Sequence, residues 1–107
     1  NQPKFEIWGS GTPLREFLYV DDLALAIEFL INKNLDKSVI NVGSSEEISI
    51  KNLAFLIKEI INYEGDLDFD KSKPDGNPRK HLDTSYLNSI GWKPKINLKK
   101  GLTNTVN

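Results

Sequence analysis

Short β-prone runs alternate with longer amphipathic segments along this chain, and this order restricts the fold to a mixed α/β architecture. Residues 4–8 and 15–20 are rich in strand-forming side chains, and the segment GSGTP at 9–13 lies between them. Turn residues between two β-prone runs are typical of a hairpin or another paired-strand excursion. The sequence therefore predicts a small α/β domain that begins with two paired strands.

The spacing of apolar residues becomes helical after Asp21 and Asp22. One of these aspartates is available as the N-cap of a helix that should end near residue 32 or 33. Ser49 is placed to cap a second amphipathic helix. The other expected elements are a short buried strand at 39–42, a strand at 67–69, a polar loop at 71–80, a short helix that starts at Asp83 or Thr84 and has Gly91 as its C′ residue, and a last helix marked by Leu98, Leu102 and Val106.

Size and composition set broad bounds on what the chain does. Its 107 residues suffice for one compact domain, and the formal charge of −1 gives no reason to expect a nucleic-acid partner. The absence of cysteine excludes disulfides and thiolate zinc sites and fits a cytoplasmic location. The apolar stretch from Leu23 to Ile31 is far shorter than the ~20 residues of a membrane span. The chain enters a strand-like segment at once without a methionine, which suggests a piece of a longer protein.

Several chemical motifs are absent or incomplete. The Gly9-Ser10-Gly11 segment lacks the third glycine and the following helix of a dinucleotide fingerprint. No tyrosine is followed by lysine four positions later, so the catalytic pair of short-chain dehydrogenases is missing. His81 is the single histidine and is interpreted as non-catalytic. Asp21 and Asp22 are interpreted as a helix cap and a solvated neighbour rather than as paired catalytic carboxylates.

The loop at 71–80 concentrates positive charge, with four basic residues against the single Asp75. Pro74 and Pro78 stiffen its backbone around a Pro-Asp-Gly turn, which lowers the entropy lost when a ligand orders the loop. Such a run is often only solvated surface, and that interpretation stays open.

Trp8 and Arg15 offer a complementary pair of recognition groups. A guanidinium presents a planar fork of donors for phosphate oxygens, and an indole presents a face on which a base or sugar stacks. With Arg79 or Lys80 arriving from the basic loop, the three side chains would form a clamp for a ligand that carries a diphosphate. The alternative is that Trp8 and Trp92 are core residues and Arg15 is a salt-bridge partner.

The segments WGSGTPLREFLYVDDLALA, INVGSSEEISIKNLA and DKSKPDGNPRKHLDTSYLNSIGWKPKINLKKGL resemble, in this order, the C-terminal part of the GDP-L-fucose synthases. These enzymes belong to the extended short-chain dehydrogenase/reductase group, also described as the NAD-dependent epimerase/dehydratase family. The KPDGxPRK segment is the specific part of the resemblance, whereas RxFxxVDD is shared by many nucleotide-sugar epimerases and dehydratases. His81 departs from the pattern, which usually has an apolar residue there.

The resemblance implies that residues 1–107 form the small substrate-binding lobe of such an enzyme. A missing N-terminal Rossmann domain would hold NADP and the catalytic residues, and would also carry the main homodimer contact. Trp8, Arg15, Asp75 and Lys80 would contact the GDP-sugar, with the arginine on the diphosphate. The implied reaction is 3,5-epimerisation and NADPH-dependent 4-reduction of GDP-4-keto-6-deoxy-mannose, and the lobe alone would be inactive.

Two alternatives to this interpretation remain open. In the first, the enzyme acts on another nucleotide sugar, such as a GDP-deoxyheptose. In the second, the chain is a free-standing module that binds anions, a protein or RNA through its basic loop. The second alternative predicts salt-sensitive binding to polyanions.

Overall fold

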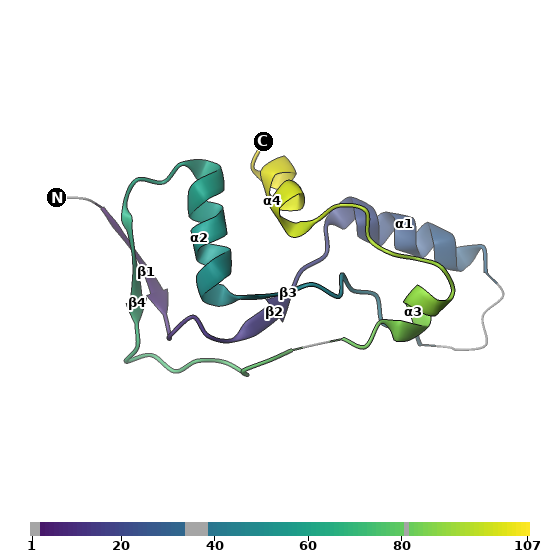
Figure 1. Cartoon of the computed structure of the whole chain (residues 1–107), viewed down its shortest axis with the longest axis horizontal. Coiled ribbons are helices and arrows are strands. Elements are labelled where there is room, and N and C mark those ends of the chain that lie inside the picture. The colour runs from purple at the N-terminus through teal and green to yellow at the C-terminus, as the bar shows by residue number, and fades with distance from the viewer. Residues whose placement is uncertain (1–2, 34–38, 81) are drawn as a thin grey trace.

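The computed structural model describes residues 3–33, 39–80 and 82–107 of the chain. In chain order the elements are β1 (Lys4–Trp8), β2 (Leu14–Glu16), α1 (Val20–Ile31), β3 (Glu47–Ser49), α2 (Ile50–Ile61), β4 (Asp66–Asp70), α3 (Ser85–Ser89) and α4 (Leu98–Val106). Figure 1 shows β1, β4 and α2 toward one end of the molecule and α1 and α3 toward the other. The expected α/β class with short strands and amphipathic helices is confirmed.

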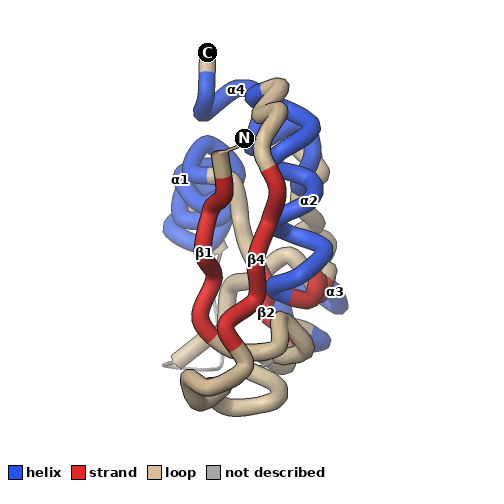
Figure 2. Tube along the Cα trace, turned by 90° about the vertical axis from the view of Figure 1, so that its left-hand side faces the viewer, coloured by secondary structure: helices blue, strands red, loops and turns tan. Residues whose placement is uncertain are grey.

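Two separate two-stranded sheets replace the expected hairpin. β1 pairs in parallel with β4, in register from Lys4↔Asp66 to Trp8↔Asp70, and the two strands lie side by side in Figure 2. β2 pairs antiparallel with β3, which the sequence analysis did not anticipate. The prediction that the two N-terminal strands pair with each other is therefore wrong.

Backbone hydrogen bonds of the segment at 9–13, here called the turn loop, explain why no hairpin forms. The amide of Gly9 donates to Asp70 O at 2.9 Å and so continues the β1–β4 ladder. The first turn of α2 then holds the rest of the loop, because the amides of Lys51 and Ile50 donate to Gly11 O and Pro13 O. The chain is thereby directed away from β1 before β2 begins. These long-range hydrogen bonds outweigh the local preference of the turn residues for a hairpin.

The helix boundaries agree with the sequence better than the strand pairing does. Ser49 caps α2 as predicted, since its hydroxyl accepts a hydrogen bond from the amide of Asn52. Gly91 follows the C-cap of α3 with φ +106°, which confirms it as the C′ residue. At α1, however, Tyr19 is the N-cap and makes no side-chain cap bond, so the predicted aspartate cap is wrong.

Asp22 has a different structural role. It is 1% exposed, and its carboxylate accepts hydrogen bonds from the backbone amides of Lys95 at 3.2 Å and Ile96 at 2.9 Å. The side chain therefore ties the first turn of α1 to the segment before α4. Asp21 is exposed, as expected for a solvated neighbour.

The apolar core is small and the molecule is elongated. Among the described residues, Ala26, Leu87 and Trp92 are the buried hydrophobic ones. The radius of gyration is 16.9 Å with extents of 59 × 31 × 15 Å, whereas a compact chain of this length has a radius of about 13 Å. The expected buried strand at 39–42 does not form: the segment pairs with no strand of the described chain, and Val39 is 80% exposed.

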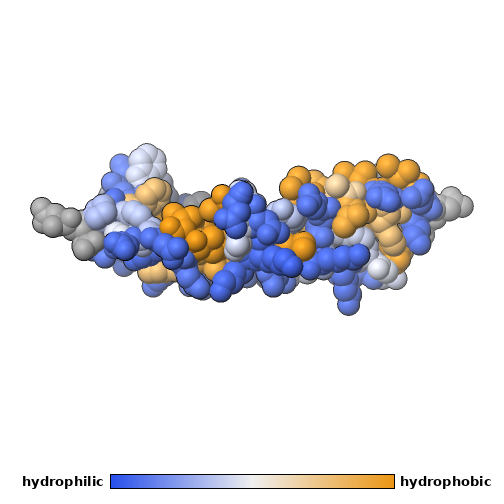
Figure 3. Space-filling view, turned by 90° about the horizontal axis from the view of Figure 1, so that it is seen from above, coloured by the Kyte–Doolittle hydropathy of each residue, from blue (hydrophilic) through white to orange (hydrophobic). Residues whose placement is uncertain are grey.

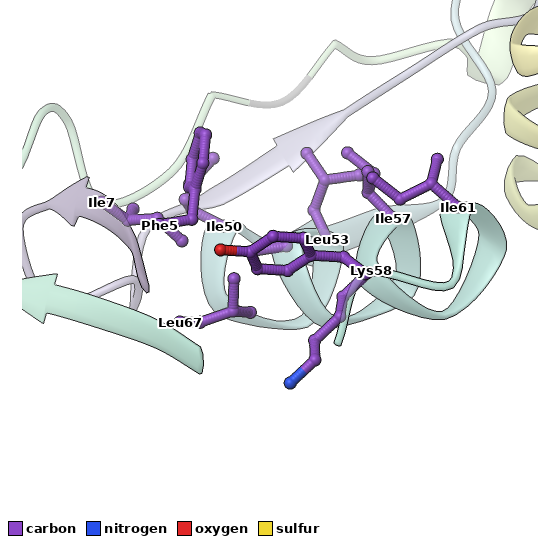
Figure 4. A pocket seen from close by; sticks show the side chains of 10 residues that line it. Phe5, Ile7, Ile50, Leu53, Ile57, Lys58, Ile61 and Leu67 are labelled. Atoms are coloured by element: carbon purple, nitrogen blue, oxygen red, sulfur yellow. The ribbon is translucent and has the colours of Figure 1, made fainter. Parts of the chain in front are cut away.

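Apolar surface is left open on both halves of the molecule. Figure 4 shows Phe5, Ile7 and Leu67 of the β1–β4 pair facing α2 across a pocket of about 290 Å³, with the Lys58 ammonium directed away from it. Apolar side chains also gather at the end that carries α1 in Figure 3. Exposed apolar residues on that helix are Val20, Leu23, Leu25, Ile27 and Ile31. No helix within the described ranges has the length and apolar character needed to cross a bilayer.

Candidate functional site

The turn loop and the basic loop, residues 71–80, meet beside the N-terminus of α2. Between them lies a small pocket of about 80 Å³. Trp8, Arg15 and Asp75 all line this pocket, and the other lining residues are Gly11, Pro13, Ile50, Pro74 and Gly76. Three of the four predicted contact residues, which are far apart in sequence, are thus brought to one place. A whole nucleotide sugar needs a larger site, because small-molecule pockets usually enclose about 300–1,000 Å³.

Asp75 is bound to the turn loop through both carboxylate oxygens. The Ser10 amide donates to its Oδ1 at 2.8 Å and the Ser10 hydroxyl donates to its Oδ2 at 2.7 Å. The Thr12 amide in turn donates to Ser10 Oγ at 3.2 Å, which fixes the orientation of the hydroxyl. The hydrogen bonds of Ser10, first from its side chain and then from its backbone, lower the pKa of Asp75 below the ordinary aspartate value.

This geometry gives a testable pH dependence. Because the folded pKa of Asp75 is depressed, the stabilisation from its ionised form is present above the unfolded pKa and is lost as pH falls through the folded pKa. We expect the Asp75 carboxyl carbon to titrate below the ordinary aspartate value in ¹³C NMR. Ser10→Ala removes the largest cause of the shift and is expected to raise the midpoint. An unchanged midpoint in that variant would contradict the assignment.

Arg15 is half-buried and joins the two loops from the other side. Its Nη1 donates to Leu14 O at 2.7 Å and to Asn77 O at 2.8 Å. Its Nε and Nη2 make no hydrogen bond to any residue in the described part of the chain, so donors remain for an anion. A Cβ at Gly76 would lie 3.1 Å from Nη2, which shows how closely the turn backbone approaches the guanidinium.

Trp8 presents an exposed ring rather than a core side chain. Its exposed fraction is 68%, and the Lys73 ammonium lies 5.0 Å from the centre of the ring. This distance is within the range of a cation–π interaction. The alternative of Trp8 as a core residue is therefore wrong, whereas Trp92 is 7% exposed and is a core residue, as that alternative expected. The Trp8 ring is exposed at the end of β1 with the Lys73 ammonium over it.

Lys80 and Arg79 diverge where the basic loop passes β2. Arg79 forms an isolated parallel bridge with Leu14, and its guanidinium makes a two-pronged ion pair with Glu47. This pair raises the pKa of Arg79, first through the hydrogen bond to Glu47 and then through the charge of that group. Lys80 is exposed and does not line the pocket. Lys80 is thus the one predicted contact residue that the structure does not place at this pocket.

The sequence analysis also considered a dinucleotide fingerprint, a metal site and a catalytic histidine. The turn loop leads into β2 and not into a helix, so it is no dinucleotide fingerprint. Within the ranges that the structure describes, no cluster of His, Cys, Asp or Glu is suited to a metal ion. The interpretation of His81 as non-catalytic concerns a residue outside the described ranges.

The sequence analysis missed Ser10, Lys73 and Glu47 as partners of site residues. Ser10 and Thr12 between two glycines carry a local signal, because serine and threonine hydroxyls stabilise turns through nearby amides. No local signal links Ser10 to Asp75 or Glu47 to Arg79, because the tertiary fold brings these pairs together across 65 and 32 positions.

Comparison with known proteins shows which class of proteins the chain is related to. Residues 1–43 match the model of the NAD dependent epimerase/dehydratase family. The fold also matches a GDP-L-fucose synthetase from Naegleria fowleri, with a TM-score of 0.89, 30% identity, and coverage of 96% of this chain and 32% of that one. A GDP-mannoheptose C4 reductase from Campylobacter jejuni, solved with NADP bound, gives a TM-score of 0.78, 39% identity, and coverage of 94% and 32%. The chain is therefore a relative of the NAD-dependent epimerases and reductases.

Within that class, the chain resembles the GDP-L-fucose synthases, as the sequence motifs indicated. It is 50% identical over 105 residues to the probable GDP-L-fucose synthase 1 of Oryza sativa subsp. japonica. This alignment covers 98% of the chain and 32% of the rice protein, so the chain spans about a third of the length of the curated relatives it matches.

Proposed function

We propose that this chain is the nucleotide-sugar-binding lobe of a longer, NADP-dependent GDP-sugar epimerase-reductase of the GDP-L-fucose synthase type. The observation that carries the proposal is the convergence of Trp8, Arg15 and Asp75 on one pocket in a chain with this similarity. The full enzyme would convert GDP-4-keto-6-deoxy-mannose by 3,5-epimerisation and 4-reduction, as a cytoplasmic homodimer.

The surface of the lobe supports the presence of a further domain. α1 exposes apolar residues on more than one side, including Leu23, Leu25 and Ile27, each at least 40% exposed. A helix that is apolar around much of its circumference is usually buried. Residues 39–42 likewise keep their strand-like composition without a partner strand in the described chain. An N-terminal Rossmann domain docked here would cover α1 and offer a sheet edge to this segment.

The residues of the lobe would contribute binding and orientation. The free donors of Arg15 suit a phosphate oxygen, and the exposed Trp8 ring suits a base or a sugar face. The Lys80 ammonium would add charge on the same side. Holding the sugar in one orientation against a reactive partner lowers the barrier without any chemistry by the lobe itself.

Two features that would serve NADP, a phosphate-binding turn and the Tyr-x-x-x-Lys pair, are not met by the described residues and by the sequence, respectively. The turn loop fails as a phosphate-binding turn, since β2 follows it, and no Tyr-x-x-x-Lys pair is present in the sequence. Hydride transfer would thus depend on residues outside the chain.

The test is GDP binding by the full-length protein. Arg15→Ala is expected to weaken GDP roughly 10- to 150-fold in calorimetry, because a charge-assisted hydrogen bond contributes about 1.5–3 kcal/mol. Arg15→Lys keeps the charge without the planar fork and should recover only part of the affinity. Lys80→Ala should also weaken GDP binding, whereas NADPH affinity should stay unchanged in all variants.

Arg79→Ala is the matched control, because this neighbouring arginine is engaged by Glu47. Its GDP affinity should remain within about twofold of wild type, as for a surface charge outside the contact. Equal GDP affinity in wild type, Arg15→Ala and Lys80→Ala would refute the clamp. Salt-sensitive binding to RNA without GDP binding would instead support a free-standing anion-binding module.

The similarity to a GDP-mannoheptose reductase favours one second candidate within the same class. A lobe that recognises GDP leaves the sugar unspecified, and the full-length enzyme would then reduce a GDP-heptose. Chromatography of the products from GDP-4-keto-6-deoxy-mannose and from a GDP-4-keto-heptose distinguishes the two: the preferred substrate is the one with the higher kcat/KM.

A further inference from the structure

Direct bonds join the turn loop and β2 to the basic loop at three points. Ser10 grips the Asp75 carboxylate, the Arg15 guanidinium donates to Asn77 O, and the Leu14 amide donates to Pro78 O at 2.8 Å. Each tie spans more than sixty positions of sequence and lies beside the pocket. The two loops are therefore held together by direct hydrogen bonds on either side of the pocket.

The Asp75 carboxylate lines the pocket and is also bound to the turn loop. Both of its oxygens accept from Ser10. A Cβ at Gly9 would lie only 2.3 Å from Asp75 Oδ1, so the carboxylate packs directly against the backbone there. Gly9 also has φ +95°, a conformation that favours glycine. The backbone at Gly9, next to Trp8, therefore leaves space for the Asp75 carboxylate where a side chain would otherwise lie.

We propose that Ser10 and Asp75 are positioning residues: their hydrogen bonds fix the turn loop to the basic loop, so that Trp8 and Arg15 stand at a set separation before the nucleotide sugar arrives. This inference rests on the proposed function of the lobe. Asp75 acts on the ligand through Trp8 and Arg15, and not as a direct acceptor for the base or the ribose.

Preorganisation explains why such ties matter for affinity. A loop that is ordered before binding costs the ligand less conformational entropy. Without the Ser10–Asp75 hydrogen bonds, both loops have to become ordered when the ligand binds. This entropy cost raises KM and the dissociation constant of GDP. The reacting groups lie elsewhere in the enzyme, so kcat of the bound complex changes little.

The experiment uses the full-length enzyme, with GDP as the binding probe and GDP-4-keto-6-deoxy-mannose for kinetics. Ser10→Ala and Asp75→Ala are each expected to raise KM and the GDP dissociation constant about tenfold, with kcat within about twofold of wild type. The double variant should be no worse than Asp75→Ala, since both changes remove one shared interaction. Asp75→Asn still offers an acceptor to the Ser10 amide and should retain most of the affinity.

Ser72→Ala is the matched control. Its hydroxyl donates a hydrogen bond to the carboxylate of Asp70 at the end of β4, at 2.5 Å, and not to the turn loop. KM and GDP affinity should be unchanged in this variant, which separates the tie between loops from a general effect of removing a serine–aspartate bond. Far-ultraviolet circular dichroism of each variant checks that the fold is retained.

The outcomes separate this inference from the function on which it rests. A wild-type protein that does not bind GDP overturns the proposed function and this inference together. Wild-type GDP binding with unaltered affinity in Ser10→Ala overturns the positioning role alone. A third outcome is that Asp75→Asn weakens GDP binding as much as Asp75→Ala does, while Ser10→Ala has no effect. Asp75 would then be a direct ligand contact, and the positioning role would be overturned.

Discussion

Replacing Asp22 with alanine is expected to lower the free energy of unfolding by roughly 3 kcal/mol. The reason is the burial of the carboxylate, which is 1% exposed and accepts hydrogen bonds from the amides of Lys95 and Ile96. Alanine leaves both amides without this acceptor and opens a gap beside α1. Urea unfolding followed by circular dichroism measures the loss, and hydrogen exchange at Lys95 and Ile96 should accelerate.

Asp21→Ala is the control for this prediction. Asp21 lies in the same helical turn, has the same charge and is exposed. Its loss should change stability by less than about 0.5 kcal/mol, as for most surface substitutions. Similar stability losses in the two variants would show that the effect comes from the charge near the helix start and not from the buried hydrogen bonds.

Gly11→Ala is expected to destabilise the chain by roughly 2–4 kcal/mol through two additive causes. Gly11 has φ +81°, which an L side chain adopts at a cost. A Cβ there would also lie 2.8 Å from Lys51 Cβ and from Phe69 Cε1, and 3.2 Å from Lys51 Cα. The turn loop would have to move away from α2, and the pocket would widen. Thermal unfolding measures the cost, and GDP affinity of the full-length protein should fall as well.

Gly91→Ala isolates the conformational cause. Gly91 has φ +106°, and a Cβ there would meet no atom within 4 Å. Its φ lies further than that of Gly11 from the left-handed minimum near 57°, so its strain is at least as large. Any excess destabilisation of Gly11→Ala over Gly91→Ala therefore reports the contact with α2 and Phe69. A smaller loss at Gly11 than at Gly91 would contradict the crowding argument.

The elements that the sequence predicted well are those governed by local rules. Ser49 caps α2 because its hydroxyl reaches an amide three residues later, and Gly91 ends α3 because it tolerates a positive φ. Both signals lie within a few residues of the structure they determine. The same holds for β1, whose bounds Lys4–Trp8 coincide with the β-prone run.

The failures concern partners at long range. Nothing near residues 9–13 reveals that β1 would choose β4 rather than β2, because the choice depends on a strand near residue 70. The segment at 39–42 has the composition of a buried strand, yet composition carries no information on whether a partner strand is present. For the candidate site, residue type predicted that Trp8 and Arg15 act together with Arg79 or Lys80, and the family resemblance added Asp75. Only the tertiary fold shows that the Ser10 amide and hydroxyl donate hydrogen bonds to the Asp75 carboxylate.

The parallel pairing of β1 with β4 has a consequence for synthesis of the polypeptide. β1 leaves the ribosome before β4, and its hydrogen-bonding partners run from Asp66 to Asp70. At roughly 5–20 residues per second, translation leaves this strand without a neighbour for several seconds. During that interval the edge of β1 that later pairs with β4 has no partner there, and unpaired strand edges favour association with other chains.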